Sequence, residues 1–300
     1  MGLMEVVSFL FNVTVLWFQA FIAVIFPPAR KSLDGQVVLI TGAGHGIGRE
    51  LALEITRAAP RAKLVLWDLN KENNDATASQ VKELGGEAYS YACDVSKSSE
   101  IHSVAQKVRQ DVGEVDVLIN NAGILYGGAL LDMEEKHIRR TFEVNTLAHF
   151  WTAREFLPAM MEKNRGHIVN IASMSAKGGT AFLVDYSASK HAVYGMTEAL
   201  GEEMRKLGKP GVKTTVVCPM FVNTGLCMFP KDRFGKVLTP EEVATATVDG
   251  MLRNEEYVFV PRPLWLSLRI TGLLPVRVNQ YIKEFGEIGI EPQYQHMKKD

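Results

Sequence analysis

The stretch QVVLITGAGHGIG at residues 36–48 decides the fold of this chain. Its apolar and β-branched start predicts a buried strand, and its glycines predict a tight turn into a helix over 47–58. Glycines at such a turn let the backbone approach a pyrophosphate, which then lies at the positive end of the helix. The glycines could instead serve only close packing of the helix on the strand, but the turn follows the first strand, where dinucleotides bind. The candidate cofactor-binding residues of this turn are Gly42, Gly46, Ile47 and Gly48.

Further β-rich runs alternate with helical stretches along the rest of the chain. This alternation predicts an α/β fold, a doubly wound parallel sheet of the Rossmann type flanked by helices. Thr239-Pro240-Glu241-Glu242 is a capping box that opens another helix. We expect an N-terminal anchor over residues 1–34 and a single dinucleotide-binding domain over 35–300, with a C-terminal substrate lid and tail. The predicted strands are 36–41, 63–68, 87–92, 115–120, 167–172, 212–217 and 258–260, and the clearest helices are 47–58, 101–112 and 184–207.

The composition excludes several classes of protein. Hydrophobic residues make up 47% and charged residues 22%, so the chain can bury a core and is not globally disordered. The net charge of −1 argues against a nucleic-acid partner. Cys93, Cys218 and Cys227 have no CxxC spacing, so we expect a reducing compartment and no disulfide framework. The scattered histidines predict no metal site.

An uncharged apolar run from Val6 to Phe26 begins the chain. Its 21 residues would span about 31 Å as a helix, enough to cross a bilayer. Pro27-Pro28 ends the run, and Arg30 and Lys31 predict that the following domain faces the cytosol. The polar residues share one stripe, which favours a helix lying in a membrane or lipid-droplet monolayer over a spanning helix, and both over a buried soluble helix. The stripe consists of Glu5, Ser8, Asn12 and Gln19.

Asp68 ends the second predicted strand, 20 residues after Gly48. An acid at this place would hydrogen-bond the ribose hydroxyls of NAD and repel the 2′-phosphate of NADP. The sequence therefore predicts NAD as the cofactor, with NADP less favoured. An aspartate at a strand end is often only a turn former, so this prediction depends on the glycine turn. His45 and Arg49 beside that turn keep an NADP-dependent carbonyl reductase open as an alternative.

Tyr186 and Lys190 are four residues apart in a predicted helix, so both face one side of it. A phenol with a pKa of about 10 is a poor base at neutral pH, and a neighbouring ammonium would lower that pKa. Ser173 precedes Tyr186 by 13 residues, and its hydroxyl could hold a substrate oxygen while Tyr186 moves the proton. The Tyr–Lys spacing is common by chance, so it needs support from other motifs.

That support comes from a resemblance to the short-chain dehydrogenase/reductase superfamily, which covers about residues 35–260. It is carried by TGAGHGIG at 41–48, NNAG at 120–123, and the Ser–Tyr–Lys spacing, all in the family's order. The resemblance implies that Tyr186 is the general acid/base, that Lys190 binds the nicotinamide ribose and lowers the pKa of the tyrosine, and that Ser173 orients the substrate. It also implies a water relay at Asn145, an adenine contact at Asp94, sheet support at Asn121, and cofactor contacts at Val222 and Thr224.

Two comparisons with this superfamily refine the prediction. The family's usual Pro-Gly after the sixth strand is Pro219-Met220 here, which would reshape the pocket beside the nicotinamide but leave binding intact. The sugar-nucleotide epimerases also have the Tyr–Lys pair, but their motif requires a glycine where this chain has His45, which excludes them. The superfamily further implies a homodimer through the helices around 147–162 and 187–205.

Longer stretches resemble one membrane-associated branch, which contains the 17β-hydroxysteroid dehydrogenases of types 11 and 13 and the epidermal retinol dehydrogenase. Its members act on lipophilic alcohols at the endoplasmic reticulum or on lipid droplets. The apolar run 226–230 fits an adaptable pocket wall, and the tail 263–285 either rests on a lipid surface or packs on the domain's own core. The matching stretches are the anchor, residues 29–49, VLWD at 65–68, FEVNTLAHFWT at 142–152 and CPMFVNTG at 218–225.

The leading hypothesis is NAD-dependent oxidation of a lipophilic alcohol, retinol or a hydroxysteroid, at the endoplasmic reticulum membrane or a lipid droplet. The rival hypothesis is a lipid-droplet surface scaffold with residual NAD binding. The intact set of Asn145, Ser173, Tyr186 and Lys190 argues against that scaffold. The third hypothesis is the NADP-dependent carbonyl reductase, which Asp68 disfavours.

Overall fold

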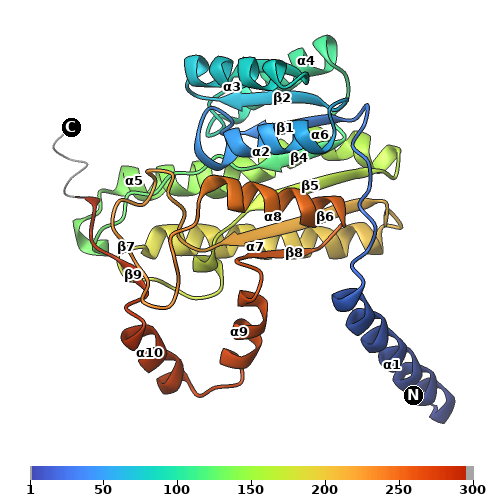
Figure 1. Cartoon of the computed structure of the whole chain (residues 1–300), viewed down its shortest axis with the longest axis vertical. Coiled ribbons are helices and arrows are strands. Elements are labelled where there is room, and N and C mark those ends of the chain that lie inside the picture. Colours follow the sequence, from blue (N-terminus) through green and yellow to red (C-terminus); the bar gives the residue numbers. More distant parts are fainter. Residues whose placement is uncertain (1, 295–300) are drawn as a thin grey trace.

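Within residues 2–294, which the computed structural model describes, a seven-stranded parallel sheet forms the centre of the molecule (Figure 1). The strand order is β3-β2-β1-β4-β5-β6-β8, so the chain reverses its direction of winding at β1, and the switch point lies between β1 and β4. The predicted α/β fold is confirmed, with each predicted strand within two residues of an observed one. The strands are β1 (Val37–Thr41), β2 (Lys63–Asp68), β3 (Glu87–Ala92), β4 (Val117–Asn120), β5 (Gly166–Ile171), β6 (Val212–Pro219) and β8 (Tyr257–Val260).

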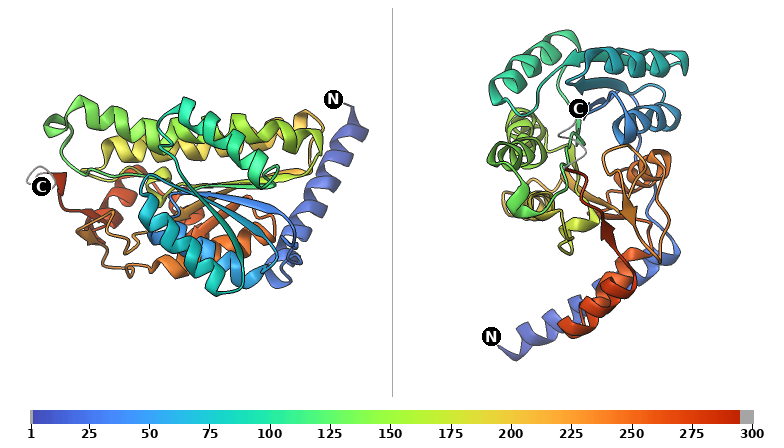
Figure 2. Two further views of the ribbon diagram at one scale, coloured as in Figure 1. Left: turned by 90° about the horizontal axis from the view of Figure 1, so that it is seen from above. Right: turned by 90° about the vertical axis from the view of Figure 1, so that its left-hand side faces the viewer.

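Helices cover the sheet in two layers (Figure 2). One layer holds α2, α3 and α8, and the other holds α4 to α7. The predicted capping box at the start of α8 is present, since Thr239 Oγ1 accepts a hydrogen bond from Glu242 N at 3.2 Å. The helices are α2 (Gly46–Ala58), α3 (Lys71–Glu83), α4 (Ser98–Asp111), α5 (Glu135–Phe142), α6 (Ala148–Glu162), α7 (Val184–Lys206) and α8 (Pro240–Leu252).

The core lies on both faces of the sheet, because a parallel sheet must be covered on both sides. All five residues of β1 are buried, as the continuous apolar run VVLIT requires. Val38 and Ile40 face the α2–α8 layer, and Leu39 faces the other layer beside Trp67. The central strands are therefore packed from both sides, and they set where the loops at their carboxyl ends begin.

Three helices stand outside this core: α1 (Leu3–Ile25), α9 (Leu264–Thr271) and α10 (Val276–Phe285). None of them has a buried residue, so the tail 263–285 does not pack on the domain's core. Both Figure 1 and the right-hand view of Figure 2 show α1 and the α9–α10 pair projecting from the same side of the molecule. Within the described chain, α1 is the one helix long and apolar enough to cross a membrane.

The segment that follows α1 is held against the domain. Lys31 N donates to Leu252 O at 2.8 Å, and Arg253 donates to the carbonyl of Pro28. Arg30 pairs with Asp249 at 2.7 Å. The apolar helix is thus attached to α8 at a fixed place.

Candidate active site

A cavity of about 1410 Å³ opens along the carboxyl ends of the strands, at the switch point beside β1 and β4. Ligand pockets are commonly about 300–1,000 Å³, so this cavity has room for a dinucleotide and a second molecule. Two predicted site residues, Gly48 and Asn145, are not among its lining residues. The predicted residues that do line it are Gly42, Gly46, Ile47, Asp68, Asp94, Asn121, Ser173, Tyr186, Lys190, Val222 and Thr224.

The glycine turn after β1 leaves no room for side chains. Gly42 has a φ of +66°, and a Cβ there would lie 2.8 Å from the Cα of Ala122. A Cβ on Gly48 would lie 2.0 Å from the carbonyl oxygen of Gly42, so Gly48 allows α2 to approach the turn rather than lining the cavity. Asn121 fixes the turn from the next strand, since its Nδ2 donates to the carbonyls of Thr41 and Gly42 at 3.0 and 3.1 Å.

The N-terminus of α2 faces the cavity without a side-chain cap. Free backbone N–H groups at a helix N-terminus, together with the helix dipole, form an anion-binding site. Thr224 closes the turn from the other side, with its Cγ2 3.2 Å from the position of a Cβ on Gly46. The uncapped helix end and the glycine turn therefore fit a pyrophosphate.

Asp68 lies at the end of β2 with its carboxylate held by backbone N–H groups. Its Oδ2 accepts from Gly44 N and its Oδ1 from Asn70 N, both at 2.8 Å. Arg49, the nearby cation, pairs with Glu50 at 2.8 Å. The carboxylate is thus fixed at the cavity wall, and the guanidinium of Arg49 is already engaged.

Asp94 follows β3 and lies in a network of hydrogen bonds. Its Oδ1 accepts from Ser96 Oγ at 2.7 Å and from Arg140 at 3.1 Å. Burial alone would raise the pKa of Asp94, but the hydrogen bonds from Ser96 and Arg140 outweigh burial and hold it below the usual value. The carboxylate stays charged, and Arg140 brings a second polar group to the same wall.

Asn145 is fully buried in a π-helical turn, Glu143–Leu147, between α5 and α6. Its Oδ1 accepts from Ile124 N at 2.8 Å, and its Nδ2 donates to Ile124 O at 2.9 Å. The side chain therefore fixes the loop that follows β4. Such single π-turns are rare and occur often at functional sites.

Ser173, Tyr186 and Lys190 meet on one wall of the cavity. The hydroxyl of Ser173 acts on the phenol of Tyr186, and Lys190 Nζ lies 5.7 Å from the centre of the tyrosine ring. Burial raises the pKa of Tyr186 to about 12, although Ser173 opposes this. Burial also lowers the pKa of Lys190 to about 8, and its Nζ donates to Ile171 O at 2.8 Å.

The half of the cavity beyond these residues is mostly apolar. The loop after β6 supplies one wall and helices α9 and α10 supply another. Met220 lines the cavity and packs against the hydrophobic core at the turn where the superfamily usually has glycine. The apolar lining residues include Phe221, Leu226, Cys227, Leu264, Leu268 and Ile282.

Several residues that line the main cavity were not predicted from the sequence. Arg140 reaches Asp94 from 46 residues away, and no motif marks it. Asn70 caps α3 by accepting from Asn73 N, a signal that capping rules could have found. The lining residues of α9 and α10 depend on where these helices fold back, which periodicity does not reveal.

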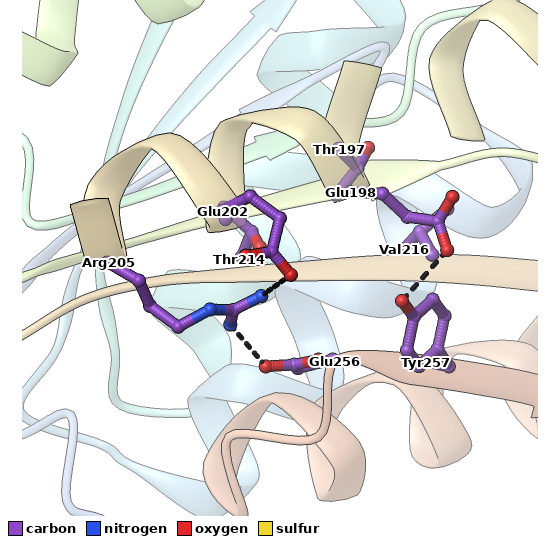
Figure 3. A pocket seen from close by; sticks show the side chains of 9 residues that line it. Thr197, Glu198, Glu202, Arg205, Thr214, Val216, Glu256 and Tyr257 are labelled. Atoms are coloured by element: carbon purple, nitrogen blue, oxygen red, sulfur yellow. Dashed lines mark hydrogen bonds and ion pairs between the residues drawn. The ribbon is translucent and has the colours of Figure 1, made fainter. Parts of the chain in front are cut away.

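A second, smaller cavity of about 270 Å³ lies between α7 and the edge of the sheet at β8 (Figure 3). Its charged side chains pair with one another: Arg205 bridges Glu202 and Glu256, and Tyr257 donates to Glu198 at 2.8 Å. These pairs join α7 to the last strand. The side chains around this cavity thus stabilise the contact between α7 and the edge of the sheet, and none of them belongs to the glycine turn.

Comparison with known proteins agrees with this geometry. The sequence model of the short chain dehydrogenase family matches residues 36–232, so the chain belongs to this family and is an oxidoreductase. It is 41% identical over 281 residues to estradiol 17-beta-dehydrogenase 11 of Mus musculus, with 94% of each chain covered. It is 38% identical over 297 residues to 17-beta-hydroxysteroid dehydrogenase 13 of Homo sapiens, with 99% of this chain and 98% of that one covered. The chain is therefore related to the hydroxysteroid dehydrogenases.

Solved structures show the same fold. A short-chain dehydrogenase/reductase from Burkholderia phymatum in complex with NAD superposes with a TM-score of 0.72 at 29% identity, covering 79% of this chain and 93% of that one. A metagenomic short-chain oxidoreductase in complex with NADP gives 0.65 at 32% identity, covering 76% and 98%. The two neighbours hold different cofactors, so the fold alone does not select between NAD and NADP.

Proposed function

We propose that this chain oxidises a lipophilic alcohol, retinol or a hydroxysteroid, to its carbonyl with NAD as the cofactor. The observation that carries the proposal is the group formed by Ser173, Tyr186 and Lys190, which lies where an apolar pocket meets the dinucleotide site. The estradiol dehydrogenase and hydroxysteroid dehydrogenase named above, similar over nearly the whole chain, support this choice of substrate class.

In this mechanism the substrate hydroxyl lies between Ser173 and Tyr186. Ser173 orients the oxygen, and Tyr186, as the phenolate, takes its proton. The ammonium of Lys190 favours the phenolate because an opposite charge nearby lowers the pKa of an acid. Bound NAD would supply the acceptor for the hydride of the alcohol carbon. The apolar pocket excludes water and holds the rest of the substrate.

The test of this mechanism is Tyr186→Phe, assayed in the full chain reconstituted in lipid with estradiol or all-trans-retinol. We expect kcat to fall at least about 100-fold, because the proton acceptor is lost, while NADH still binds. Tyr281→Phe, at a tyrosine 66% exposed on α10, is the control. Substantial turnover by the Tyr186 variant would contradict the mechanism. If the wild type turns over neither alcohol but still binds NADH, the scaffold hypothesis would be favoured.

We also propose that Asp68 selects NAD. The carboxylate is fixed at the end of β2, and Arg49, which would otherwise attract a 2′-phosphate, is paired with Glu50. Asp68→Ser should raise kcat/KM for NADP and lower it for NAD, because it removes a ribose acceptor together with a repelling charge. Asp75→Ser, at an exposed acid of α3, is the control. An unchanged ratio of the two cofactors would reject Asp68 as the selector.

The exposed helices support a proposal about location. We propose that residues 1–34 anchor the domain over 35–300 to the endoplasmic reticulum membrane or a lipid droplet, and that α9 and α10 rest on the same surface. Trp265, Ile270 and Leu273 are 44–88% exposed, and Arg269 and Arg277 add positive charge beside them. Apolar side chains with flanking arginines suit a lipid interface.

Liposome flotation tests this location. Deleting residues 1–26 should weaken binding strongly, and replacing Trp265 and Leu273 with serine should weaken it further. Leu131→Ser, at a residue 97% exposed in the short 3-10 helix Leu130–Asp132, is the control for lost apolar surface. Unchanged binding of the Trp265 and Leu273 variant would limit the lipid contact to α1.

A further inference from the structure

The loop after β6 covers the substrate half of the cavity. We call residues 224–231 the lid. Leu226 and Cys227 line the cavity, and Cys227 packs in an apolar cluster with Leu125, Leu183 and Tyr186. The lid has little regular structure of its own, apart from the two residues of β7 (Pro230–Lys231). Its position therefore depends on what holds it from outside.

The segment after α10 lies alongside the lid. We call residues 286–294 the strap. Its strand β9 (Gly289–Ile290) pairs antiparallel with β7, and Glu291 N donates to Phe229 O at 3.2 Å. Ile290 joins the same apolar cluster as Cys227. The strap thus contributes both backbone pairing and apolar contact to the lid.

Gln293 makes two side-chain hydrogen bonds from the strap to the lid, in addition to the exposed ion pair between Glu291 and Lys231 at 2.7 Å. Its side chain is almost fully buried, with Oε1 accepting from Met228 N at 2.8 Å and Nε2 donating to Leu226 O at 3.1 Å. These two bonds flank Cys227 on both sides, as a neighbouring strand would. The backbone of Gln293 is itself fixed, because its N–H donates to Gly127 O at 2.9 Å.

We infer that Gln293 is a positioning residue that holds the lid against Tyr186 and so sets which alcohols the pocket accepts. This inference rests on the proposed alcohol oxidation for its kinetic part. The primary amide is the group required, because its oxygen accepts from the backbone N–H of Met228 while its nitrogen donates to the backbone carbonyl of Leu226. Without it, two partly buried backbone groups of the lid lose their partners, which favours an open lid.

Cys227 provides a readout of the lid that does not depend on activity. The other two cysteines, Cys93 and Cys218, are buried and serve as internal standards. Gln293→Met keeps the length of the side chain and removes both hydrogen bonds. We expect alkylation of Cys227 by iodoacetamide to become about tenfold faster, with Cys93 and Cys218 unchanged. Gln280→Met, at an exposed glutamine of α10, is the matched control.

The kinetic readout compares the effect of the variant on the KM of the alcohol with its effect on the Kd of the cofactor. Gln293→Met should raise KM for the lipophilic alcohol about tenfold and leave the Kd of NADH within about twofold, because Gln293 holds Leu226 and Met228 and not Thr224, the lid residue beside the glycine turn. Equal loss of alcohol and cofactor affinity would indicate a general structural defect and overturn the inference. Alkylation of Cys227 at the wild-type rate would overturn it as well, even if the alcohol proposal itself failed.

A second variant separates the donor from the acceptor. Gln293→Glu keeps the acceptor for Met228 N, but its carboxylate faces the carbonyl of Leu226 without a proton. Lowering the pH should protonate the carboxyl group and restore the donor, so the excess alkylation rate over wild type should shrink as pH falls from 7.5 to 5.5. A ratio to wild type that is constant over this pH range would show that the donor to Leu226 has no part in holding the lid.

Discussion

At the scale of single residues, burial governs the protonation of Tyr186 and Lys190. Burial alone works against both charged forms, since it raises the pKa of Tyr186 to about 12 and lowers that of Lys190 to about 8. A phenol in this state is no base at neutral pH. The proposed mechanism therefore needs the positive charge of Lys190, together with that of the oxidised cofactor, to bring the pKa of the tyrosine down.

Lys190→Met tests this dependence. Removal of the ammonium leaves the phenolate without its neighbouring charge, so the pKa of Tyr186 should rise and the pH profile of alcohol oxidation should move to higher pH. A shift of one pH unit would lower the rate at pH 7 about tenfold. The measurement is kcat against pH from 6 to 10, with Lys163→Met at an exposed lysine as the control. A pH profile at the same position as that of the wild type would show that Lys190 does not lower the pKa of Tyr186.

At the scale of elements, the sequence predicted the strands well because each central strand is buried on both faces and must be apolar. VVLIT of β1 and VLIN of β4 are such runs, and their register brings Gly42 and Asn121 together. Most of the predicted cavity residues could be found in the same way, since they lie at or just after the end of a strand or near the start of a helix. The attachment of the lid to the strap could not be predicted, because Gln293 acts through two hydrogen bonds to the backbone that leave no periodic pattern.

Asp249 of α8 forms ion pairs with the two segments that connect the projecting helices α1 and α9 to the domain. Its carboxylate pairs with Arg30 after α1 at 2.7 Å, with Arg253 at 2.9 Å, and with Arg262 before α9 at 2.7 Å. Burial alone would raise the pKa of Asp249, but Arg30 and Arg253 outweigh it and hold the pKa below its usual value. One carboxylate thus attaches both projecting segments to the same helix.

Asp249→Asn should loosen both segments while leaving the sheet intact. We expect trypsin to cleave after Arg30 and Lys31 several times faster, because local opening there costs less free energy. The free energy of unfolding should fall by about 1–2 kcal/mol, as three guanidinium groups lose a half-buried partner. Glu241→Gln, at an exposed acid of the same helix, is the control. Equal cleavage rates in the two variants would mean that Asp249 does not fix the linker.

At the scale of the whole molecule, two histidines are buried in the sheet–helix interior without charge. His149 lies in α6, where its Nδ1 hydrogen-bonds Asn170 Oδ1 at 3.1 Å. Burial and the nearby Lys190 lower the pKa of His149 to about 3. His167 lies in β5 with Lys31 Nζ 2.7 Å from its Nδ1, and burial together with Lys31 and Lys213 lowers its pKa well below the usual value. Both imidazoles therefore stay neutral in the folded protein at neutral and mildly acidic pH.

The stability of the fold should therefore fall in mild acid. The unfolded chain binds a proton at each histidine below about pH 6.5 and the folded chain does not, so the stabilisation present above pH 6.5 is lost as pH falls. Each histidine should contribute about 1.4 kcal/mol per pH unit below that point. Urea unfolding of the detergent-solubilised full chain at pH 7.5, 6.5 and 5.5 measures the slope. His149→Gln should remove about half of it and His191→Gln, at an exposed histidine, none; equal slopes in the two variants would refute the assignment.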